Sequence, residues 1–266
     1  MRVAVIGHVE WCEFVHVERV PLAGEIAEGS SFLEEPAGGG AVAAVQMVRL
    51  AGSCDFFTAL GDDALARRAI ARLSGLGVTV HAAKRPKPTR RGWVYTDGAG
   101  ERTITVIGEK LVPSLDDPLS WDALDSADAV FFVAGADGTL ERARAARFLG
   151  ATTRSLPPGP GVALDAAIGS SNDESEAFAP GDLNPEPALS VWTNSAAGGR
   201  WRTSNGKEGT YEAAPLPGPV ADAYGAGDSF AAATTFALGR GDSVDDALAF
   251  GARCGAAQLT RSGPYA

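Results

Sequence analysis

Cysteine is scarce in this chain, whose 266 residues include only Cys12, Cys54 and Cys254. These three lie far apart and show no Cys-x-x-Cys spacing, which argues against a disulfide framework and against a structural zinc site. Long apolar runs are missing too, because no stretch approaches the roughly 18 residues that a membrane-spanning helix needs. The first apolar run, residues 3–6, is too short for a signal-peptide core. We therefore expect a cytoplasmic protein without a membrane partner.

An excess of positive charge is also absent. The chain has 23 Lys and Arg residues against 33 Asp and Glu residues, for a net charge of −10. Binding to nucleic acid or to an anionic membrane requires a basic face, so we expect neither partner. Apolar residues make up 45% and charged residues 21% of the sequence, which is typical of a globular protein with a sizeable core. The length suits one large domain that spans residues 1–266.

Short apolar runs alternate with helical patterns along most of the chain. The pattern predicts strands at residues 3–6, 56–58, 78–80, 129–133, 162–165 and 189–193. It predicts helices at residues 41–50, 64–73, 140–149, 229–238 and 244–257. Strands that alternate with helices imply a parallel sheet covered on both faces, which is a three-layer α/β/α domain of the α/β class. Residues 157–161 are rich in proline and glycine and should form a loop.

Two segments, residues 10–36 and 86–108, do not fit this pattern. Both alternate apolar and polar residues, as strands with one solvated face do, and Asp97-Gly98-Ala99-Gly100 would form a hairpin turn between two of the strands. We predict that the two segments form a small β-sheet that lies over one edge of the domain as a lid. Exposed strand edges tend to pair with another chain, so the pattern is compatible with a homodimer through the lid.

The most specific signal is a glycine-rich segment that leads into an alanine-rich helix: Asp222-Ala223-Tyr224-Gly225-Ala226-Gly227-Asp228-Ser229-Phe230. Its glycines allow successive N–H groups to point at one spot where the helix begins, which makes an anion-binding site. Asp228 stands in the middle of that site. The alternative is that Asp228 only caps the helix, but a cap requires neither two preceding glycines nor a second Asp at the start of the loop.

This segment is similar to the signature Asp-Thr-x-Gly-Ala-Gly-Asp-x-Phe of the ribokinase family, the PfkB-type carbohydrate kinases. Weaker matches follow the family's order: Val5-Ile6-Gly7, Pro36-Ala37-Gly38-Gly39-Gly40, Gly61-Asp62-Asp63, and Trp192-Thr193-Asn194 with Gly198-Gly199. The resemblance covers most of the chain and implies a ribokinase-like (Rossmann-like) fold with a small β-sheet lid. The chain has no Gly-x-x-x-x-Gly-Lys-Ser/Thr segment, so a P-loop kinase is excluded.

The resemblance implies transfer of a phosphoryl group from ATP to a hydroxyl group of a sugar or sugar-like substrate. Asp228 would act as the general base, and the N–H groups of Gly225, Ala226 and Gly227 would stabilise the charge of the transferred group. Two alternatives stay open: a non-catalytic sugar- or nucleotide-binding or regulatory protein on the same fold, and a nucleoside kinase. A nucleoside kinase would need an aromatic clamp on the base, for which the candidates are Trp11, Phe14 and Trp93.

The resemblance also implies where ATP would bind. The nucleotide groove would be lined by residues from two loops and the last helix: Thr193, Asn194, Gly198, Gly225, Gly227 and Gln258. Gln258 would border adenine. Asp222 resembles the family residue that helps to bind a monovalent cation such as K⁺, although a plain turn carboxylate is the alternative.

The family orders Mg²⁺ with an Asn-x-x-Glu segment, which this chain lacks in its usual form. Counted from Asn172, the Glu position holds Ser175. Shifted by one residue, Asp173 and Glu176 form a carboxylate pair. One carboxylate can suffice because Mg²⁺ keeps several of its waters, and we expect Glu176 near the metal, with Asp173 or Asn172 beside it. The alternative is a solvated acidic loop.

The substrate end departs further from the family. Its usual sugar-binding Asp is replaced by Cys12, which lies between Glu10 and Glu13, and its usual Asn is replaced by Ala43. Either Glu10 or Glu13 replaces the Asp, or the substrate is unlike ribose; both Glu residues also suit a solvated lid face. Gly38 and Gly39 would let the substrate approach the backbone closely.

Two arginines and a histidine remain near this substrate end. Arg90 and Arg91 precede a lid strand and could contact a phosphorylated sugar or the phosphates of ATP, since Arg suits bidentate phosphate contact. A solvated basic loop is the alternative. His8, next to the first strand, could touch substrate, but we expect that it does not.

Overall fold

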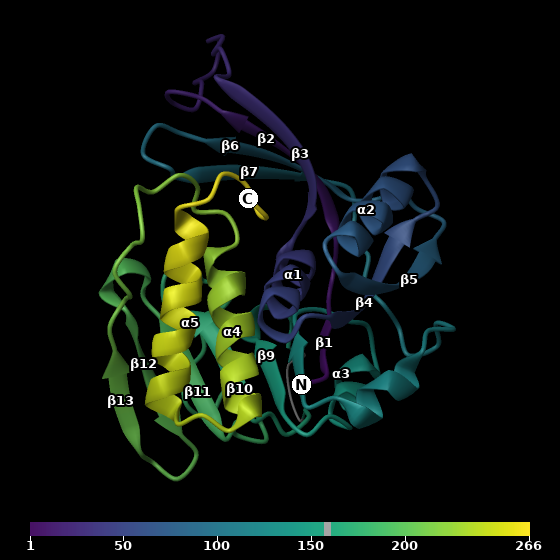
Figure 1. Cartoon of the computed structure of the whole chain (residues 1–266), viewed down its shortest axis with the longest axis vertical. Helices are drawn as coiled ribbons and strands as arrows, with labels where there is room; N and C mark the ends of the chain where they lie inside the picture. Colours follow the sequence, from purple (N-terminus) through teal and green to yellow (C-terminus); the bar gives the residue numbers. More distant parts are fainter. Residues whose placement is uncertain (157–160) are drawn as a thin grey trace.

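The computed structural model describes residues 1–156 and 161–266, which form a large sheet covered by helices and a small sheet next to it (Figure 1). Within the described residues the large sheet has nine strands in the order β13-β12-β11-β10-β9-β8-β1-β4-β5. In chain order these are β1 (Val3–Ile6), β4 (Cys54–Gly61), β5 (Val78–Arg85), β8 (Ala129–Phe132), β9 (Leu149–Thr152), β10 (Ala166–Ser170), β11 (Leu189–Thr193), β12 (Gly199–Thr203) and β13 (Glu208–Tyr211).

The centre of this sheet is parallel and buried on both faces. β1 pairs in parallel with β4 on one side and with β8 on the other. Every residue of β1 and β8 is buried, which explains why both read as continuous apolar runs rather than as alternating ones. β12 and β13 extend the sheet as an antiparallel hairpin at one edge. The mixed sheet is therefore parallel from β11 to β5 and antiparallel at the β12–β13 edge.

Helices cover the sheet on both sides, which confirms the three-layer α/β/α fold. Val3 and Val5 pack with one set of helices: α1 (Gly39–Ala51), α2 (Ala64–Gly75), α4 (Ala226–Arg240) and α5 (Val244–Leu259). Ala4 and Ile6 face the other layer, which contains the short helix α3 (Thr139–Ala143) and the 3₁₀ turn η1 (Trp121–Ser126). Among the described helices, none is long and apolar enough to cross a bilayer.

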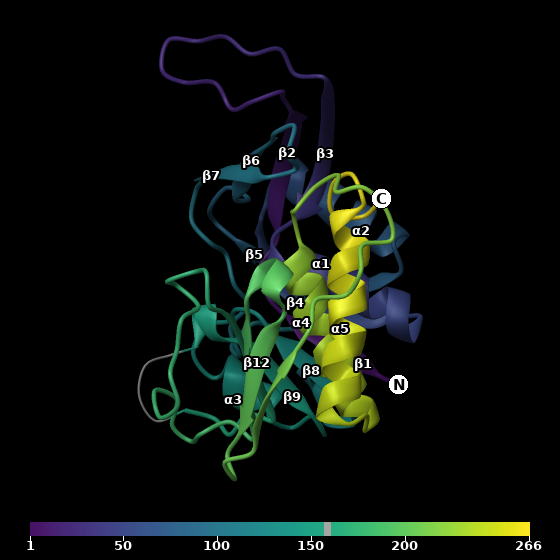
Figure 2. The ribbon, with the colours of Figure 1, turned by 90° about the vertical axis from the view of Figure 1, so that its left-hand side faces the viewer.

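The small sheet is the predicted lid. Its strands are β2 (Glu10–His16), β3 (Ser31–Ala37), β6 (Arg91–Thr96) and β7 (Arg102–Ile107), in the order β3-β2-β6-β7. In both views it lies above the ends of α1 and α4 (Figures 1 and 2). One of its faces packs on the body of the protein, where the rings of Phe14 and Tyr224 meet edge to face at 5.0 Å. The strands lie within residues 10–37 and 91–107, so β3 ends one residue beyond the expected segment 10–36.

Three sequence predictions need correction. The predicted helix 140–149 is only the five-residue α3, followed by strand β9, and the predicted strand 162–165 lies just before β10. Short apolar runs do not distinguish a buried strand from a buried helix, and only pairing between β8 and β10 makes residues 149–152 a strand. The hairpin β12–β13 was not predicted because its polar edge strands carry little apolar signal. Residues 157–160 of the predicted loop lie outside the described residues.

The start of α1 lies against the end of β1 without space for a side chain. A Cβ atom added at Gly40 would lie 2.7 Å from the backbone oxygen of His8 and 2.8 Å from its nitrogen. These neighbours are backbone atoms, which cannot rotate away as a flexible side chain could. Gly40 therefore sets how closely α1 approaches the strand that precedes the lid.

We expect Gly40→Ala to lower the free energy of unfolding by about 1–3 kcal/mol, because the added methyl group forces α1 away from β1. Gly75→Ala is the matched control, since it is also a helical glycine but a Cβ atom there meets nothing within 4 Å. It should leave stability unchanged or raise it slightly, because alanine favours the helix. Urea denaturation of the two variants measures the difference, and equal stabilities would contradict the close approach.

Candidate active site

The N-terminal ends of α1 and α4 meet below the lid. A Cβ atom on Gly39 would lie 2.7 Å from Oδ1 of Asp228, and one on Gly225 would lie 2.8 Å from Cγ1 of Val42. Helix N-termini carry unpaired N–H groups and a partial positive charge. The close approach therefore brings two such ends, and the Asp228 carboxylate, to one place at the carboxyl end of the sheet.

Asp228 lies in the first turn of α4 and does not cap the helix. The N-cap is Gly225, in a left-handed conformation with φ of 78°, and no side chain caps this end of α4. The glycine is required because a side chain at positive φ is strained and because Val42 fills the space. The capping alternative is thus not what the structure shows, and the carboxylate is available for another partner.

The surroundings of Asp228 change its proton affinity. Burial raises the pKa of Asp228 from 3.8 to about 6, and the Glu176 carboxylate adds to the rise. The positive charges of Arg102 and Arg154 lower it again by a smaller amount. A carboxylate with this pKa is ionised at neutral pH but holds a proton more readily than ordinary Asp, which suits a general base.

The loop before α4 is held by Asp222 and Tyr224. The buried Asp222 carboxylate accepts hydrogen bonds from the N–H groups of Tyr224 at 2.9 Å and of Gly263 at 3.2 Å. The Tyr224 hydroxyl accepts one from the N–H of Gly38 at 2.9 Å. Asp222 thus shapes the anion loop in this structure, and its part in binding a monovalent cation stays a prediction.

Gln258 departs from its expected place beside adenine. It is fully buried, and its amide nitrogen donates to the carbonyl oxygens of Tyr224 at 3.3 Å and of Gly263 at 3.0 Å. Both donor hydrogens are thereby used inside the protein. Gln258 supports the loop that holds Asp228 from behind, and its side chain does not face a nucleotide groove.

On the lid side, Glu10 lies in a small polar cluster next to Gly38. Its Oε1 is 3.1 Å from Nε of Arg90 and 3.7 Å from Nε2 of His8. A Cβ atom on Gly38 would lie 3.1 Å from the His8 ring and 3.3 Å from Cγ of Glu10. Burial raises the pKa of Glu10, while Arg90 and Lys110 lower it. Glu10, rather than Glu13, is therefore the carboxylate near the glycine segment.

Cys12 and Glu13 occupy different places from those expected. Cys12 is fully buried, with Sγ 3.7 Å from the Tyr224 hydroxyl, and burial raises its pKa to about 12. It fills space beneath the lid and offers no polar group to a substrate. Glu13 points to the opposite face of the lid, where it pairs with Arg91. Ala43, at the family's Asn position, is fully buried in α1.

The three aromatic candidates do not form a clamp. Phe14 is buried against Tyr224, and Trp11 lies under the guanidinium of Arg68 with its indole N–H donated to Glu34. Trp93 is the strand neighbour of Glu13, so it lies on the outer face of the lid, edge to face with Tyr95. Successive strand residues face opposite sides, which separates Phe14 from the other two.

The expected nucleotide loop follows β11. Thr193 ends that strand, and the 3₁₀ turn η3 (Ser195–Ala197) follows Asn194, whose N–H donates to the carbonyl oxygen of Gly198 at 2.8 Å. Gly198 has a φ of 76°, and a Cβ atom there would clash with the carbonyl oxygen of Tyr211. Asn172 lies next to this turn and donates from Nδ2 to the Ser195 hydroxyl at 3.1 Å.

Asp173 and Glu176 lie together, but with a cation that the sequence did not suggest. Arg154, in the 3₁₀ turn η2 (Thr153–Ser155), pairs with Asp173 and approaches Oε1 of Glu176 to 2.9 Å. No group of three or more His, Cys, Asp or Glu side chains in the described part of the chain forms a metal site. A Mg²⁺ ion held by one carboxylate and by substrate phosphates would not need such a group.

Sequence reasoning also missed Lys110. This residue follows the last lid strand, and its charge acts on His8, Glu10 and Arg90. Neither Arg154 nor Lys110 belongs to a recognisable motif, because each is brought to the site by the fold from a segment with no pattern of its own. The basic run near residue 90 was the one available signal, and it pointed to only part of the cluster.

The chain matches the sequence model of the pfkB family carbohydrate kinases over residues 1–149 and 169–266. Among solved structures it is similar to ribokinase from Thermotoga maritima (20% identity, TM-score 0.75, covering 100% of this chain and 95% of that chain). It is also similar to Arabidopsis thaliana ribokinase complexed with ribose and ATP (19% identity, TM-score 0.75, covering 98% of this chain and 93% of that chain). A third similar structure is adenosine kinase from Sinorhizobium meliloti (17% identity, TM-score 0.74, covering 100% of this chain and 95% of that chain). At these identities the structural likeness shows the fold. No curated protein matches the chain.

The raised pKa of Asp228 predicts a pH-dependent gain in stability for Asp228→Asn. The folded state binds the proton more tightly than the unfolded chain, so the ionised carboxylate destabilises the fold as pH rises from about 4 to about 6. At pH 8 the variant should be more stable than the parent by about 1–3 kcal/mol. The gain should shrink as pH falls from about 6 to about 4.

Chemical denaturation at a series of pH values measures this difference. Asp116→Asn is the control, because Asp116 is exposed and forms no ion pair with any residue that the structure describes. The same gain in both variants would show that net charge, rather than burial of Asp228, causes the effect.

Proposed function

Since this chain belongs to the pfkB family of carbohydrate kinases, we propose that it transfers the γ-phosphoryl group of ATP to a hydroxyl group of a sugar or sugar-like substrate. The observation that carries this proposal is the place of Asp228, beside Gly39 and inside the first turn of α4. A proton acceptor and an anion-binding helix end lie together there, and transfer of a phosphoryl group to an alcohol requires both.

In the proposed reaction Asp228 takes the proton of the acceptor hydroxyl while the oxygen of that hydroxyl forms a bond to the γ-phosphorus of ATP. The bond from that phosphorus to the β,γ-bridging oxygen breaks, and ADP leaves with the electron pair. The N–H groups in the first turn of α4 have no partner within the helix and would stabilise the charge on the transferred group. Their orientation is set by Gly225 and by the buried hydrogen bonds of Asp222.

Glu176 is the residue proposed to hold Mg²⁺, through water or directly. The fit rests on its chemistry and place: it offers carboxylate oxygens, and its charge acts on Asp228. When bound, Mg²⁺ supplies positive charge that shields the phosphates. Arg154, which pairs with both Glu176 and Asp173, would be close enough to add positive charge for the phosphates.

The lid would cover the acceptor and exclude water. Strand β7 turns Ile104 and Val106 to the same face as Phe14, and both are exposed in this structure. They give the lid an apolar wall for the non-reacting side of the acceptor. Arg102, on the same face, donates to the carbonyl oxygen of Ala223 at 3.0 Å and ties the lid to the anion loop. Exclusion of water prevents hydrolysis of ATP in place of transfer.

A homodimer through the lid is part of the proposal. Phe32 and Ile107 lie on the outer face and are 59% and 52% exposed, so two copies could bury them against each other. A cytoplasmic location stays a prediction, as does the single domain over residues 1–266.

A binding protein on the same fold is the second candidate, and the loss of the usual sugar contacts at Cys12 and Ala43 favours it. The nucleoside kinase alternative stays open, because the family and the likeness to adenosine kinase from Sinorhizobium meliloti are compatible with it, but Trp11, Phe14 and Trp93 form no clamp for a base. Asp228 separates the first candidate from the second, since a binding protein has no need of a base in its anion site.

ADP release should be acceptor-dependent, and Asp228→Asn should lower the turnover number by about 10²–10⁴-fold. The measurement is a coupled ADP assay with Mg-ATP over a panel of sugars, sugar acids, sugar phosphates and nucleosides. The rate should also rise about tenfold per pH unit up to about pH 6 and then level off, because the ionised form of Asp228 is the active one.

Binding of ATP or a sugar without turnover by any acceptor would favour the binding protein. Turnover that survives in Asp228→Asn would reject the assigned base. Because that substitution is expected to stabilise the fold, loss of activity in it does not reflect unfolding.

Glu176→Gln should raise the Mg²⁺ concentration needed for half-maximal rate by about tenfold, because it removes a metal-binding charge. The matched control is Glu174→Gln, two residues away, exposed and without an ion pair to any described residue. Titration of the rate with Mg²⁺ at constant ATP compares the two. An equal shift in both variants would assign the effect to the general acidity of this loop.

A further inference from the structure

On the lid side of the site, two cationic side chains, Arg90 and Lys110, lie near a single carboxylate of the described chain, that of Glu10. Arg90 and Lys110 both act on Glu10, and among the described residues Glu10 is the carboxylate that forms an ion pair with Arg90. Lys110 is half-buried and forms no ion pair with any residue that the structure describes. In a chain with a net charge of −10, a half-buried lysine beside an arginine is costly unless a negative charge joins them.

Two buried polar atoms of this cluster also lack partners. His8 is only 9% exposed, yet its Nδ1 has no hydrogen bond within the described residues. Nε of Arg90 is buried in the same way, since it is close to Glu10 but not aligned for a hydrogen bond. Buried polar groups are normally paired, so Nδ1 of His8 is an atom whose hydrogen bond a ligand would complete.

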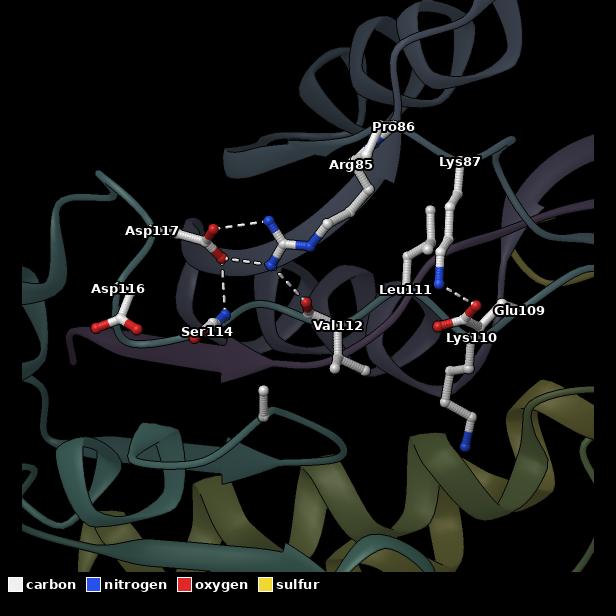
Figure 3. Close-up of a pocket in the computed structure, with 11 residues that line it drawn as sticks. Arg85, Pro86, Lys87, Glu109, Lys110, Leu111, Val112, Ser114, Asp116 and Asp117 are labelled. Carbon is white, nitrogen blue, oxygen red and sulfur yellow. Dashed lines mark hydrogen bonds and ion pairs between the residues drawn. The ribbon is translucent and has the colours of Figure 1, made fainter.

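The backbone places Lys110 next to this cluster. β7 pairs with β6 so that Ile107 lies opposite Arg91, and a Cβ atom on Gly108 would lie 3.8 Å from Cα of Arg90. Lys110 follows two residues later and lines the edge of a pocket of about 410 Å³. In Figure 3 its side chain points away from the Lys87–Glu109 and Arg85–Asp117 pairs and joins neither.

The cluster lies on the acceptor side of the base. Asp228 is in contact with the position of Gly39, whereas His8 and Glu10 surround the preceding residue, Gly38. The base and the cluster therefore lie against adjacent residues of the glycine segment. Arg154, which pairs with Glu176, also acts on His8, Lys110 and Asp228.

We propose that the acceptor carries a second, anionic group, a carboxylate or a phosphate, and that Arg90 and Lys110 bind it while His8 donates or accepts a hydrogen bond. This rests on the proposed function, because it assumes that the hydroxyl to be phosphorylated lies at Asp228. Glu10 positions Arg90 and binds an acceptor hydroxyl. His8 is neutral, since burial and then the charge of Lys110 lower its pKa to about 3, so it adds no third positive charge.

The test compares each neutral sugar with an acid and a phosphate ester derived from it: ribose, ribonate and ribose 5-phosphate, and glucose, gluconate and glucose 6-phosphate. Binding to the full chain is measured by calorimetry without nucleotide. At least one anionic member should bind tenfold or more tightly than its neutral parent. Arg90→Met and Lys110→Met should each remove that preference, and Lys110→Arg should restore most of it.

Two neighbouring cations serve as controls. Arg91→Met removes a charge from the outer face of the lid, and Lys87→Met removes a lysine that pairs with Glu109. Both should keep the preference for the anionic compound. A preference that survives in Arg90→Met and Lys110→Met would mean that the anion binds at the α4 end and would overturn the proposal, as would equal binding of neutral and charged members throughout.

Measuring ADP release from Mg-ATP with the same compounds tests the proposed function separately from this inference. If anionic compounds bind through Arg90 and Lys110 but none gives ADP with Mg-ATP, the anion site stands as a ligand-binding site, whereas the kinase proposal and the assignment of the anion to a phosphoryl acceptor fail. If a neutral sugar is phosphorylated and its charged relatives are not, the kinase proposal stands and the inference fails. A rise in the KM for ATP in both variants, with the acceptor KM unchanged, would assign the two cations to the nucleotide and overturn the inference.

Discussion

The close approach of α1 and α4 at their N-terminal ends is the constraint on which the site depends. Gly39 touches the Asp228 carboxylate, and Gly225 touches Val42, so neither helix could hold its place with larger residues there. Asp222, Tyr224 and Gln258 then hold the connecting loop from behind with buried hydrogen bonds. Asp228, the proposed base, and the N-terminal end of α4 are thus positioned by backbone packing.

This arrangement destabilises the folded protein at one residue, because the carboxylate of Asp228 is buried. Burial, and then the nearby Glu176 carboxylate, raise the pKa of Asp228 to about 6, and a buried charge of this kind lowers stability at neutral pH. Arg102 and Arg154 reduce the cost without removing it. The same burial that destabilises the carboxylate gives it the proton affinity of a base, so stability and proposed function are opposed at this position.

The lid divides its residues between two environments by strand alternation. His8 and Glu10 lie beside the glycine segment of the site. Cys12 and Phe14 follow Glu10 on the same face of the lid and are buried as packing residues. Glu13 lies on the outer face, where it pairs with Arg91. A replacement of the family's Asp by Cys12 therefore does not leave an empty binding position, because Tyr224 packs against the sulfur. The carboxylate that lies next to Gly38 belongs instead to Glu10, two residues earlier on the same strand.

The sequence by itself determined the fold class, the lid segments and the importance of residues 222–230. Those features have local signals: buried parallel strands read as apolar runs, lid strands alternate, and an anion loop needs its glycines at fixed spacing. Only the tertiary structure decided which charged residues meet. Arg154 and Lys110 come from segments without a pattern, Gln258 turned inward, and Glu10 was separated from Glu13 by strand alternation that depends on pairing with β3 and β6. Charge clusters of this kind are built by contacts between distant segments, which no local spacing in a sequence specifies.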